Sequence, residues 1–490
     1  MGQRIAPCIA VFISVLLQAA CGSFPVNPPL AKYDPSTGYR FNLPPDEGDK
    51  RDRLFVILVF SGGGTRAAAL SYGVMEALRD TRIHWQDQDV SLLDETDVIS
   101  SISGGSFPAA YYALYGSKIF NEFPKKFLYR PVQSDLTRLA LSPASWLKLV
   151  GSSFGRSDLA AEFYDREVFG GGTYADVIVQ HKRPFVILNA TDLSTGAQFP
   201  FIQDQFDLLC SDLAGVKIAR AAAASSAFPG GLTPLTFQNY AGTCNYCQPP
   251  WVDLAVKDHR SRVNAQRTAR AERRVAYTDT EIDPITDTKQ ASRKYIHLTD
   301  GGVADNIGLR EPLTAIAGIN NSWSVLQRIN LKQVDKLVVI VVNAATNPET
   351  RRDKTPKVPG LLDTVMTVAT IPLDNYSFET LELLRTTVND FNQEMQLVSG
   401  CKELAAGKGP QCALDIPMPH HVDFFPVEVA FEYIESDHDR NWFKNLPTSF
   451  ELPRETVDKL REVGRQILRE DPQFKKLMEK LRRVRTSGPE

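Results

Sequence analysis

Four apolar runs rich in Val and Ile constrain the fold of this chain more than any other feature. They show little alternation of apolar and polar residues, so each predicts a strand buried on both faces. Helical stretches lie between them, notably at 66–79 and 105–116. Strands separated by helices predict an α/β fold, with a mostly parallel central sheet flanked by helices on both faces. The predicted strands are LFVILVF (54–60), DVISSI (97–102), FVILNAT (185–191) and KLVVIVVNA (336–344).

The N-terminus has the pattern of an export signal. Arg4 is the only charge before the apolar run IAVFISVLLQAAC, and a transmembrane helix needs roughly 20 apolar residues, which makes this run short for a membrane span. LQAAC resembles the lipobox of bacterial lipoproteins, with Gln18 where that motif usually has leucine. We expect a signal peptide over 1–20 and lipidation of Cys21. An ordinary cleaved signal peptide is the alternative.

The residues after the candidate anchor are rich in Pro, Gly, Ser and Asp. They predict a flexible tether over 21–50. A lipidated Cys21 predicts a membrane-anchored protein of the bacterial cell envelope that faces the periplasm. Gly22 after Cys21 is compatible with sorting to the outer membrane.

Apart from Cys8 in the signal peptide and Cys21 at the candidate anchor, the chain has five cysteines, so at least one thiol stays free or pairs between chains. Cys244 and Cys247 have the spacing of half a zinc site, but no second Cys/His pair accompanies them. They predict a local disulfide or unpaired thiols. Cys401 and Cys412 bracket a polar loop and could be bridged in an oxidising compartment.

Two internal segments depart from the α/β pattern. The segment 257–295 is highly charged and almost lacks large aliphatic residues, which predicts a solvated surface insertion. The run LTRLALSPASWLKLVGSSF (136–154) is apolar, with one Trp and two basic residues. It fits a cap over an active site, a membrane-facing patch or a plain core helix.

The segment 446–490 predicts C-terminal helices. The last helix begins at Asp471 and Pro472, and its other face is strongly basic. Such a helix either lies on an anionic membrane or docks on the domain. The formal net charge of −3 gives no basis for nucleic-acid binding. The apolar face consists of Phe474, Leu477, Met478, Leu481 and Val484.

A glycine-rich loop follows the first predicted strand. In FSGGGTR, Gly62, Gly63 and Gly64 lead into a helix that begins near Arg66. Glycines allow close backbone approach, and a helix N-terminus offers free N–H groups, so this loop can hold a phosphate or a developing oxyanion. It matches neither G-x-G-x-x-G nor a P-loop, which counts against a nucleotide site.

A second loop, SISGGS, places Ser103 at a predicted strand-to-helix turn. Such a turn exposes a hydroxyl at the carboxyl end of a sheet. Gly105 lets a neighbouring chain come close, and Ser101 stands where a nucleophile elbow usually has glycine. By itself this stretch leaves open whether Ser103 is a nucleophile or a turn serine.

A serine nucleophile needs a base, and a third loop offers one. In LTDGG, Asp300 precedes Gly301 and Gly302 just beyond the short strand KYIHL. An aspartate at a strand end can point into a site at the same edge of the sheet, although an ordinary Asp-Gly turn gives the same pattern. None of the seven histidines lies in a setting that marks a triad partner, and His297 reads as structural.

Taken together in chain order, GGGTR, SISGGS, the Ala/Ser-rich block ARAAAASSAFPGGLTPL (219–235) and TDGG resemble the patatin-like phospholipase family. The resemblance implies an α/β/α catalytic domain over 51–445 and makes Ser103 the nucleophile and Asp300 its base. It implies an oxyanion hole of Gly62, Gly63 and Gly64, with Arg66 as the basic residue of the motif and Gly105, Gly301 and Gly302 in support. It implies an acyl-lipid substrate, with no metal or other cofactor.

Two alternatives stay open. One is an esterase with a Ser-His-Asp triad, for which His297 or His420 would be essential. The other is a catalytically silent lipid-binding or scaffold protein of the envelope on the same fold.

Overall fold

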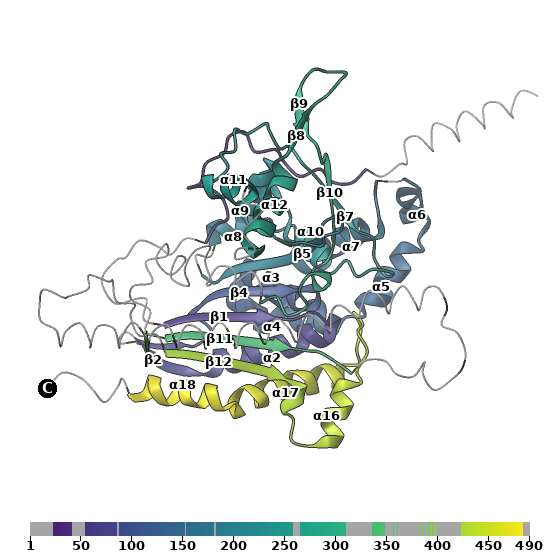
Figure 1. Ribbon diagram of the computed structural model, residues 1–490. Helices are drawn as coiled ribbons and strands as arrows, with labels where there is room; N and C mark the ends of the chain where they lie inside the picture. Colours follow the sequence, from purple (N-terminus) through teal and green to yellow (C-terminus); the bar gives the residue numbers. More distant parts are fainter. Residues whose placement is uncertain are drawn as a thin grey trace, which may run out of the picture.

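The centre of the molecule is one mixed sheet, as the computed structural model in Figure 1 shows. The structure describes residues 23–41, 54–85, 88–151, 153–180, 183–257, 265–309, 336–347 and 423–483, with positions 356, 360, 382, 386, 389, 393, 396 and 397. The strand order is β12-β11-β1-β4-β5-β10-β7, and β6 pairs with β5. The strands are β1 (Leu54–Phe60), β4 (Thr96–Ile102), β5 (Phe185–Asp192), β6 (Gln198–Pro200), β7 (Leu235–Gln238), β10 (Tyr295–Asp300), β11 (Lys336–Asn343) and β12 (Asp423–Ala430).

The four predicted strands are all present and form a continuous parallel block. β12, β11, β1, β4 and β5 run parallel to one another, whereas β10 is antiparallel to β5 and to β7. Every residue of β1, β4 and β5 is buried, which explains their unbroken apolar sequence. Strand order reverses at β1, because the chain continues from β1 to β4 on one side and adds β11 on the other. Such a reversal is where sites form in open α/β sheets.

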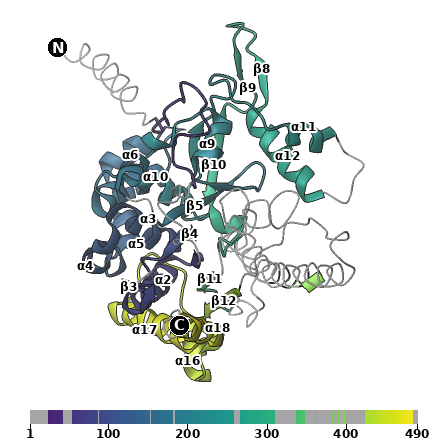
Figure 2. The ribbon, with the colours of Figure 1, turned by 90° about the vertical axis from the view of Figure 1, so that its left-hand side faces the viewer.

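The helices pack around this sheet, as Figure 2 shows. The predicted helices 66–79 and 105–116 are present as α2 and α3. The fold is therefore the predicted one, a mostly parallel sheet flanked by helices. The helices are α2 (Gly64–Asp80), α3 (Ser106–Tyr115), α4 (Ile119–Phe123), α5 (Val132–Ala140), α6 (Pro143–Leu149), α7 (Arg156–Tyr164), α8 (Tyr174–Gln180), α9 (Gln203–Phe206), α10 (Ile218–Ser225), α11 (Pro250–Lys257), α12 (Ala265–Thr278), α16 (Asp437–Lys444), α17 (Arg454–Glu470) and α18 (Pro472–Arg483).

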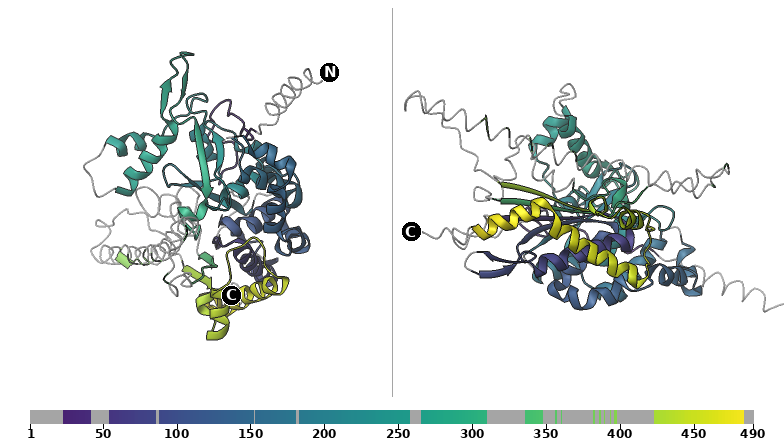
Figure 3. Two further views of the ribbon diagram at one scale, coloured as in Figure 1. Left: turned by 90° about the vertical axis from the view of Figure 1, so that its right-hand side faces the viewer. Right: turned by 90° about the horizontal axis from the view of Figure 1, so that it is seen from below.

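The C-terminal helices pack into the domain, and Figure 3 shows them running along it. α17 crosses α2 so closely that a Cβ on Gly73 would lie 2.2 Å from the carbonyl oxygen of Arg461. Glu76 on α2 pairs with Arg461 at 2.8 Å and with Arg465 at 3.3 Å. On α18, Phe474, Leu477 and Leu481 are buried in the main core. Of the two alternatives for this helix, the burial supports docking of its apolar face on the domain.

The charged segment 257–295 holds α12 and the two-stranded hairpin of β8 (Thr280–Ile282) and β9 (Lys289–Ala291). α11 and α12 share a small cluster of Val252, Ala255 and Ala271 that is separate from the main core. Figure 1 shows these elements at one end of the molecule. A second small hairpin pairs β2 (Arg82–Trp85) with β3 (Gln88–Ser91).

Residues 23–41, which the sequence predicts to belong to a flexible tether, pack against the domain as a strap. Asn27 is buried and donates to Ser211 Oγ at 2.8 Å and to the Gln238 carbonyl oxygen at 3.0 Å. The tether expectation is therefore wrong for this part of 21–50. Polar composition alone did not reveal that these side chains and main-chain groups find partners on the domain. Cys21 and residues 42–50 lie outside the described residues.

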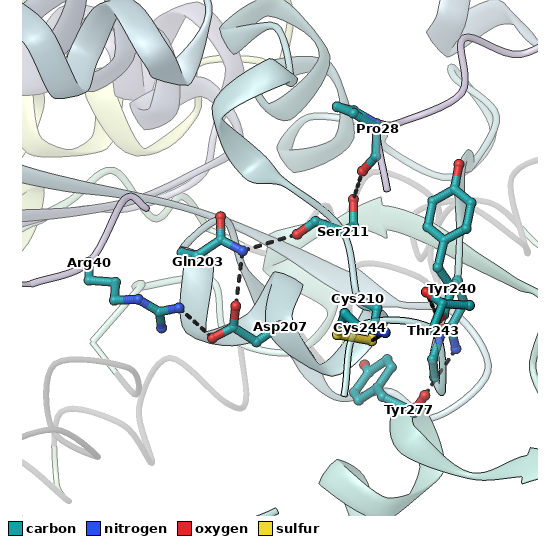
Figure 4. The surroundings of a disulfide bond; sticks show 12 residues. Pro28, Arg40, Gln203, Asp207, Cys210, Ser211, Tyr240, Thr243, Cys244 and Tyr277 are labelled. Atoms are coloured by element: carbon teal, nitrogen blue, oxygen red, sulfur yellow. Dashed lines mark hydrogen bonds and ion pairs between the residues drawn. A yellow bond between two sulfur atoms is a disulfide. The ribbon is translucent and has the colours of Figure 1, made fainter. Parts of the chain in front are cut away.

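A disulfide lies beneath this strap (Figure 4). Cys244 pairs with Cys210, and the strap binds both, since Leu30 N–H donates to the Cys210 carbonyl oxygen at 2.7 Å and Tyr33 N–H to that of Cys244 at 2.8 Å. The expected local bridge between Cys244 and Cys247 is thus wrong, and Cys247 is exposed and free. The predicted bridge between Cys401 and Cys412 lies outside the described residues.

At the other end of the strap, Arg40 pairs with Asp207 at 2.6 Å and with Asp204 at 3.0 Å. Asp207 also accepts from Gln203 Nε2 at 3.0 Å (Figure 4). The strap is therefore held at both ends, by the loops around the disulfide and by an ion pair.

We expect the double variant Cys210→Ala/Cys244→Ala to lose roughly 2–4 kcal/mol of unfolding free energy, because the bridge closes a loop of 34 residues. Urea unfolding measures the loss. Limited proteolysis should also cut the strap faster, since its acceptors lie on the bridged loops. Cys247→Ser is the control and should behave as wild type. Equal stability of the double variant and wild type would contradict the assigned pair.

Candidate active site

The glycine-rich loop lies between β1 and α2 and is fixed to β11. Ser61 N–H donates to the Val342 carbonyl oxygen at 3.0 Å, and Ser61 Oγ accepts from Ala344 N–H at 2.9 Å. Gly63 has φ 134° and Gly64 has φ 59°, conformations that side-chain-bearing residues rarely adopt. The glycines therefore let the chain turn from the strand directly into α2.

The amides of this loop are not equivalent. Gly62 N–H already donates to the Asn306 carbonyl oxygen at 3.0 Å, so the expectation that all three glycines offer free amides is wrong for Gly62. Among the residues that the structure describes, no acceptor takes the N–H of Gly63 or Gly64. These two groups lie at the N-terminus of α2, where the helix dipole favours negative charge.

Ser103 follows β4 directly and starts a tight turn. Its φ of 47° places it in the left-handed region, at a cost of about 1–3 kcal/mol for a residue with a side chain. A 3₁₀ turn over Ser103–Gly105 then leads into α3. A Cβ on Gly104 would lie 2.0 Å from the Gly64 carbonyl oxygen. The serine turn and the glycine loop are therefore in direct contact, and only glycine fits at that point.

Asp300 meets Ser103 from the other side of β5. Ser103 Oγ donates to Asp300 Oδ2 at 2.8 Å, and both residues are buried. Gly302 N–H donates to Asp300 Oδ1 at 2.8 Å, and the main chain of Asp300 donates to the Ala227 carbonyl oxygen at 3.1 Å. The sequence-predicted pair is thus in hydrogen-bond contact, and each carboxylate oxygen of Asp300 has one donor.

Burial raises the pKa of Asp300 to about 6, although the hydrogen bonds from Gly302 and Ser103 act in the opposite direction. A carboxylate with this pKa is largely ionised at neutral pH and is a stronger base than an exposed aspartate. This matches what a general base working near neutral pH requires.

No histidine that the structure describes contacts Ser103. His84 pairs with Asp89, His438 with Asp439, and the exposed ring of His297 lies 3.1 Å from Thr236 Oγ1. His297 is therefore structural, as expected. His181, His259, His420 and His421 lie outside the described residues.

Ser225 is a site residue that sequence reasoning missed. Its Oγ accepts the N–H of Ser103 at 2.9 Å and donates to the Asn189 carbonyl oxygen at 2.6 Å. It also lies 2.9 Å from Ser106 Oγ. Ser225 ends α10 and so ties the strained turn at Ser103 to β5. It lies in the Ala/Ser-rich block, but no pattern separates it from the adjacent Ser226.

The predicted supporting residues stabilise the loops rather than face the nucleophile. Arg66 donates to the carbonyl oxygens of Ala344 at 2.9 Å and Leu446 at 2.7 Å, which ties the start of α2 to the C-terminal region. A Cβ on Gly105 would lie 2.6 Å from the Ser61 carbonyl oxygen, and one on Gly301 would lie 2.2 Å from that of Asn189.

The site therefore combines a serine hydroxyl bonded to a carboxylate with main-chain N–H groups that have no acceptor among the described residues. Acyl transfer needs groups of these kinds. Within the described ranges, no group of three or more His, Cys, Asp or Glu side chains is placed to hold a metal ion. In the same ranges, no helix has both the length and the apolar character to cross a bilayer.

Comparison with known proteins places this geometry in context. A family model described as patatin-like phospholipase matches residues 58–313. No curated protein matches the chain.

Solved structures with some similarity include human GIVD cytosolic phospholipase A2 and VipD from Legionella pneumophila. The first is 13% identical with a TM-score of 0.31, over 58% of this chain and 42% of that chain. The second is 10% identical with a TM-score of 0.28, over 89% of this chain and 72% of that chain. This chain therefore spans less than half the length of the human protein.

We expect Asp300→Asn to raise the unfolding free energy at pH 8 by about 1–3 kcal/mol, because it removes a buried charge. The raised pKa of Asp300 means that its contribution to wild-type stability is present below about pH 4 and is lost as the pH rises through about 6. The advantage of the variant should therefore grow over that interval and stay constant above it. Urea unfolding at pH 4.5, 6 and 8 measures it.

Asp176→Asn is a matched control, since hydrogen bonds from Thr173 lower the pKa of this exposed aspartate. That variant should show no gain in stability at pH 8. A stability of Asp300→Asn that equals wild type at every pH would contradict a buried, raised-pKa carboxylate.

Proposed function

The chain belongs to the patatin-like phospholipase family, and on this premise we propose that it is a serine-dependent lipid acyl hydrolase. Its reaction is the cleavage of acyl esters of membrane lipids, of phospholipase A or lysophospholipase type. The observation that carries the proposal is the 2.8 Å hydrogen bond from Ser103 Oγ to Asp300 Oδ2, in a turn that packs directly against the glycine loop at Gly64.

In the proposed first step, Ser103 Oγ attacks the ester carbonyl carbon while its proton passes to Asp300 Oδ2. The carbonyl π electrons move to the oxygen, and the N–H groups of Gly63 and Gly64 stabilise the oxyanion. When the tetrahedral intermediate collapses, the C–O bond to the lipid alcohol breaks. Asp300 returns the proton to the leaving oxygen, and an acyl ester of Ser103 remains.

In the second step, water attacks the acyl ester and gives a proton to Asp300. Collapse of the second tetrahedral intermediate releases the fatty acid, and Ser103 Oγ recovers the proton from Asp300. Asp300 thus acts first as base and then as acid in each half-reaction. Gly302 holds the other carboxylate oxygen and so orients the base through both steps.

We expect Ser103→Ala and Asp300→Asn each to lower fatty-acid release from phospholipid vesicles by about 10³-fold or more, because each removes an indispensable part of the dyad. The wild-type kcat/KM should fall below about pH 6, since protonated Asp300 cannot accept the serine proton. Mass spectrometry of the released acids and lysolipids also identifies the acyl position.

The exposed Ser117→Ala serves as the matched serine control and should keep full activity. His297→Ala and His420→Ala should also stay active, whereas loss in either would favour a Ser-His-Asp esterase. Undiminished release by Ser103→Ala would exclude the dyad. A wild-type protein that binds vesicles but resists a fluorophosphonate probe would be the catalytically silent alternative.

We also propose that the protein is anchored in a bacterial cell envelope through a lipidated Cys21 and faces the periplasm. The lipobox-like LQAAC supports the anchor. The disulfide between Cys210 and Cys244 supports an oxidising compartment, because cytosolic thiols are kept reduced.

Radiolabelled palmitate should enter the wild-type protein in a bacterial host, and Cys21→Ser should take up none. Cys247→Ser is the matched control, and it should label like wild type because this exposed thiol lies outside the lipobox-like stretch. Absence of label from the wild type would favour the ordinary cleaved signal peptide.

A further inference from the structure

Helices α5 and α6 present an apolar patch, defined as Leu141, Trp146, Leu147 and Val150. These side chains are 79%, 65%, 44% and 54% exposed, and they fall within ten consecutive residues. A plain core helix, one of the sequence-based alternatives for 136–154, is therefore wrong. Clustered large apolar side chains on a surface mark a contact site, whereas single exposed ones are ordinary.

The packing of α6 holds this patch outward. Ser145 is buried and its N–H donates to the N-capping Ser142 Oγ, so the small polar residue faces inward while Trp146 faces solvent. On the same helix, Lys148 Nζ lies 2.9 and 3.0 Å from the Glu162 carboxylate oxygens and 5.5 Å from the centre of the Phe154 ring. The helix therefore turns a small polar side chain toward the protein and large apolar side chains toward solvent, which is the opposite of the usual arrangement at a soluble surface.

Two charged residues, Arg138 and Lys148, occur from Leu136 to Gly151, and both are basic and exposed. Each is paired with a carboxylate, Arg138 with Asp135 at 3.2 Å and Lys148 with Glu162 at 2.9 Å. An exposed Trp with aliphatic neighbours and basic residues suits the boundary between lipid head groups and acyl chains.

The segments at both ends of the α5–α6 unit are linked to the candidate site through intermediate residues. At its start, Gln133 Oε1 accepts from Ser449 Oγ at 2.8 Å, and the Ser449 carbonyl oxygen accepts from Thr65 N–H at 2.8 Å, directly after the glycine loop. Beyond its end, Ser157 N–H donates to Thr233 Oγ1 at 3.3 Å. Thr233 follows the loop in which Ala227 accepts from the main chain of Asp300.

The position of the unit in the fold agrees with these contacts. α5 and α6 lie at the side of the molecule toward which β1, β11 and β12 point, as Figure 1 shows. Ser103 follows the carboxyl end of β4, which runs parallel to β1. The patch and the nucleophile therefore lie toward the same edge of the sheet.

We propose that the α5–α6 unit seats the protein on a phospholipid bilayer, with Trp146, Leu147, Val150 and Leu141 in the head-group region. This surface rests on the proposed function, because it brings the edge of the sheet that carries Ser103 to the membrane that holds the substrate. The patch works independently of an acyl anchor at Cys21.

The test uses the full chain with Cys21→Ser, so that no acyl anchor contributes, and vesicles of phosphatidylcholine with and without phosphatidylglycerol. Trp146→Ser/Leu147→Ser/Val150→Ser should weaken vesicle partitioning in sedimentation by about tenfold or more, because three large apolar side chains leave the membrane. Hydrolysis of vesicle lipid should fall with it, whereas hydrolysis of a monomeric short-chain ester should stay unchanged. Val179→Ser/Ile285→Ser removes two apolar side chains elsewhere that are still more exposed, at 84% and 92%, and should partition like wild type.

Two results would contradict the proposal that this patch binds the membrane. The first is unchanged vesicle partitioning of the triple variant. The second is a wild-type dimer in light scattering that the triple variant converts to a monomer without a change in partitioning. Ser103→Ala separates this surface from the proposed function, since it should lose hydrolysis and still partition like wild type. Circular dichroism and unfolding of the triple variant should match wild type, because the replaced side chains are exposed.

Discussion

The hydrogen bond from Ser103 to Asp300 is the contact on which the rest of the site depends. The two residues lie 197 positions apart in the sequence. Ser103 follows β4 and Asp300 ends β10, and these two strands flank β5. They meet because β4 pairs parallel with β5 while β10 pairs antiparallel, so the end of β10 comes beside the start of the serine turn. Ser225 Oγ links the Ser103 amide to the Asn189 carbonyl oxygen of β5, and Thr191 Oγ1 of β5 donates to the Asp300 carbonyl oxygen at 2.8 Å. The mixed sheet is therefore the arrangement that brings Ser103 and Asp300 together.

This contact places opposing demands on stability and function. A buried carboxylate without a cation is costly, and burial raises the pKa of Asp300 accordingly. The positive φ of Ser103 adds local strain. The fully buried parallel strands and the packing of α17 on α2 provide the stability that makes such a site tolerable. The glycines at 63, 64 and 104 remove the steric conflict where the two loops meet.

Two amphipathic segments with basic residues end in opposite environments. α18 buries Phe474, Leu477 and Leu481 in the core, whereas α6 buries Ser145 and exposes Trp146 and Leu147. Both have the composition of a membrane-binding helix, so composition could not separate them. The neighbouring elements decide, since α18 covers β12 and α6 is held by Glu162 and the cap at Ser142. The same holds for residues 23–41, whose loop-like composition conceals a strap fastened to the disulfide loops.

The sequence by itself determined the strands β1, β4, β5, β10 and β11 and the helices α2 and α3, and it singled out Ser103 and Asp300, which the structure brings into contact. Unbroken Val/Ile runs indicate strands buried on both faces, and the glycines beside Ser103 and Asp300 indicate tight turns. Both patterns can be recognised from neighbouring residues in the sequence. The resemblance of four motifs, in chain order, to the patatin-like phospholipase family then predicted that those loops belong to one site. Only the tertiary structure decided which groups remain available. In the structure, the Gly62 N–H donates to Asn306, Cys244 forms a disulfide with Cys210, and the Ser103 N–H donates to Ser225. Hydrogen-bond partners and burial depend on neighbours distant in the chain, and no local pattern encodes them.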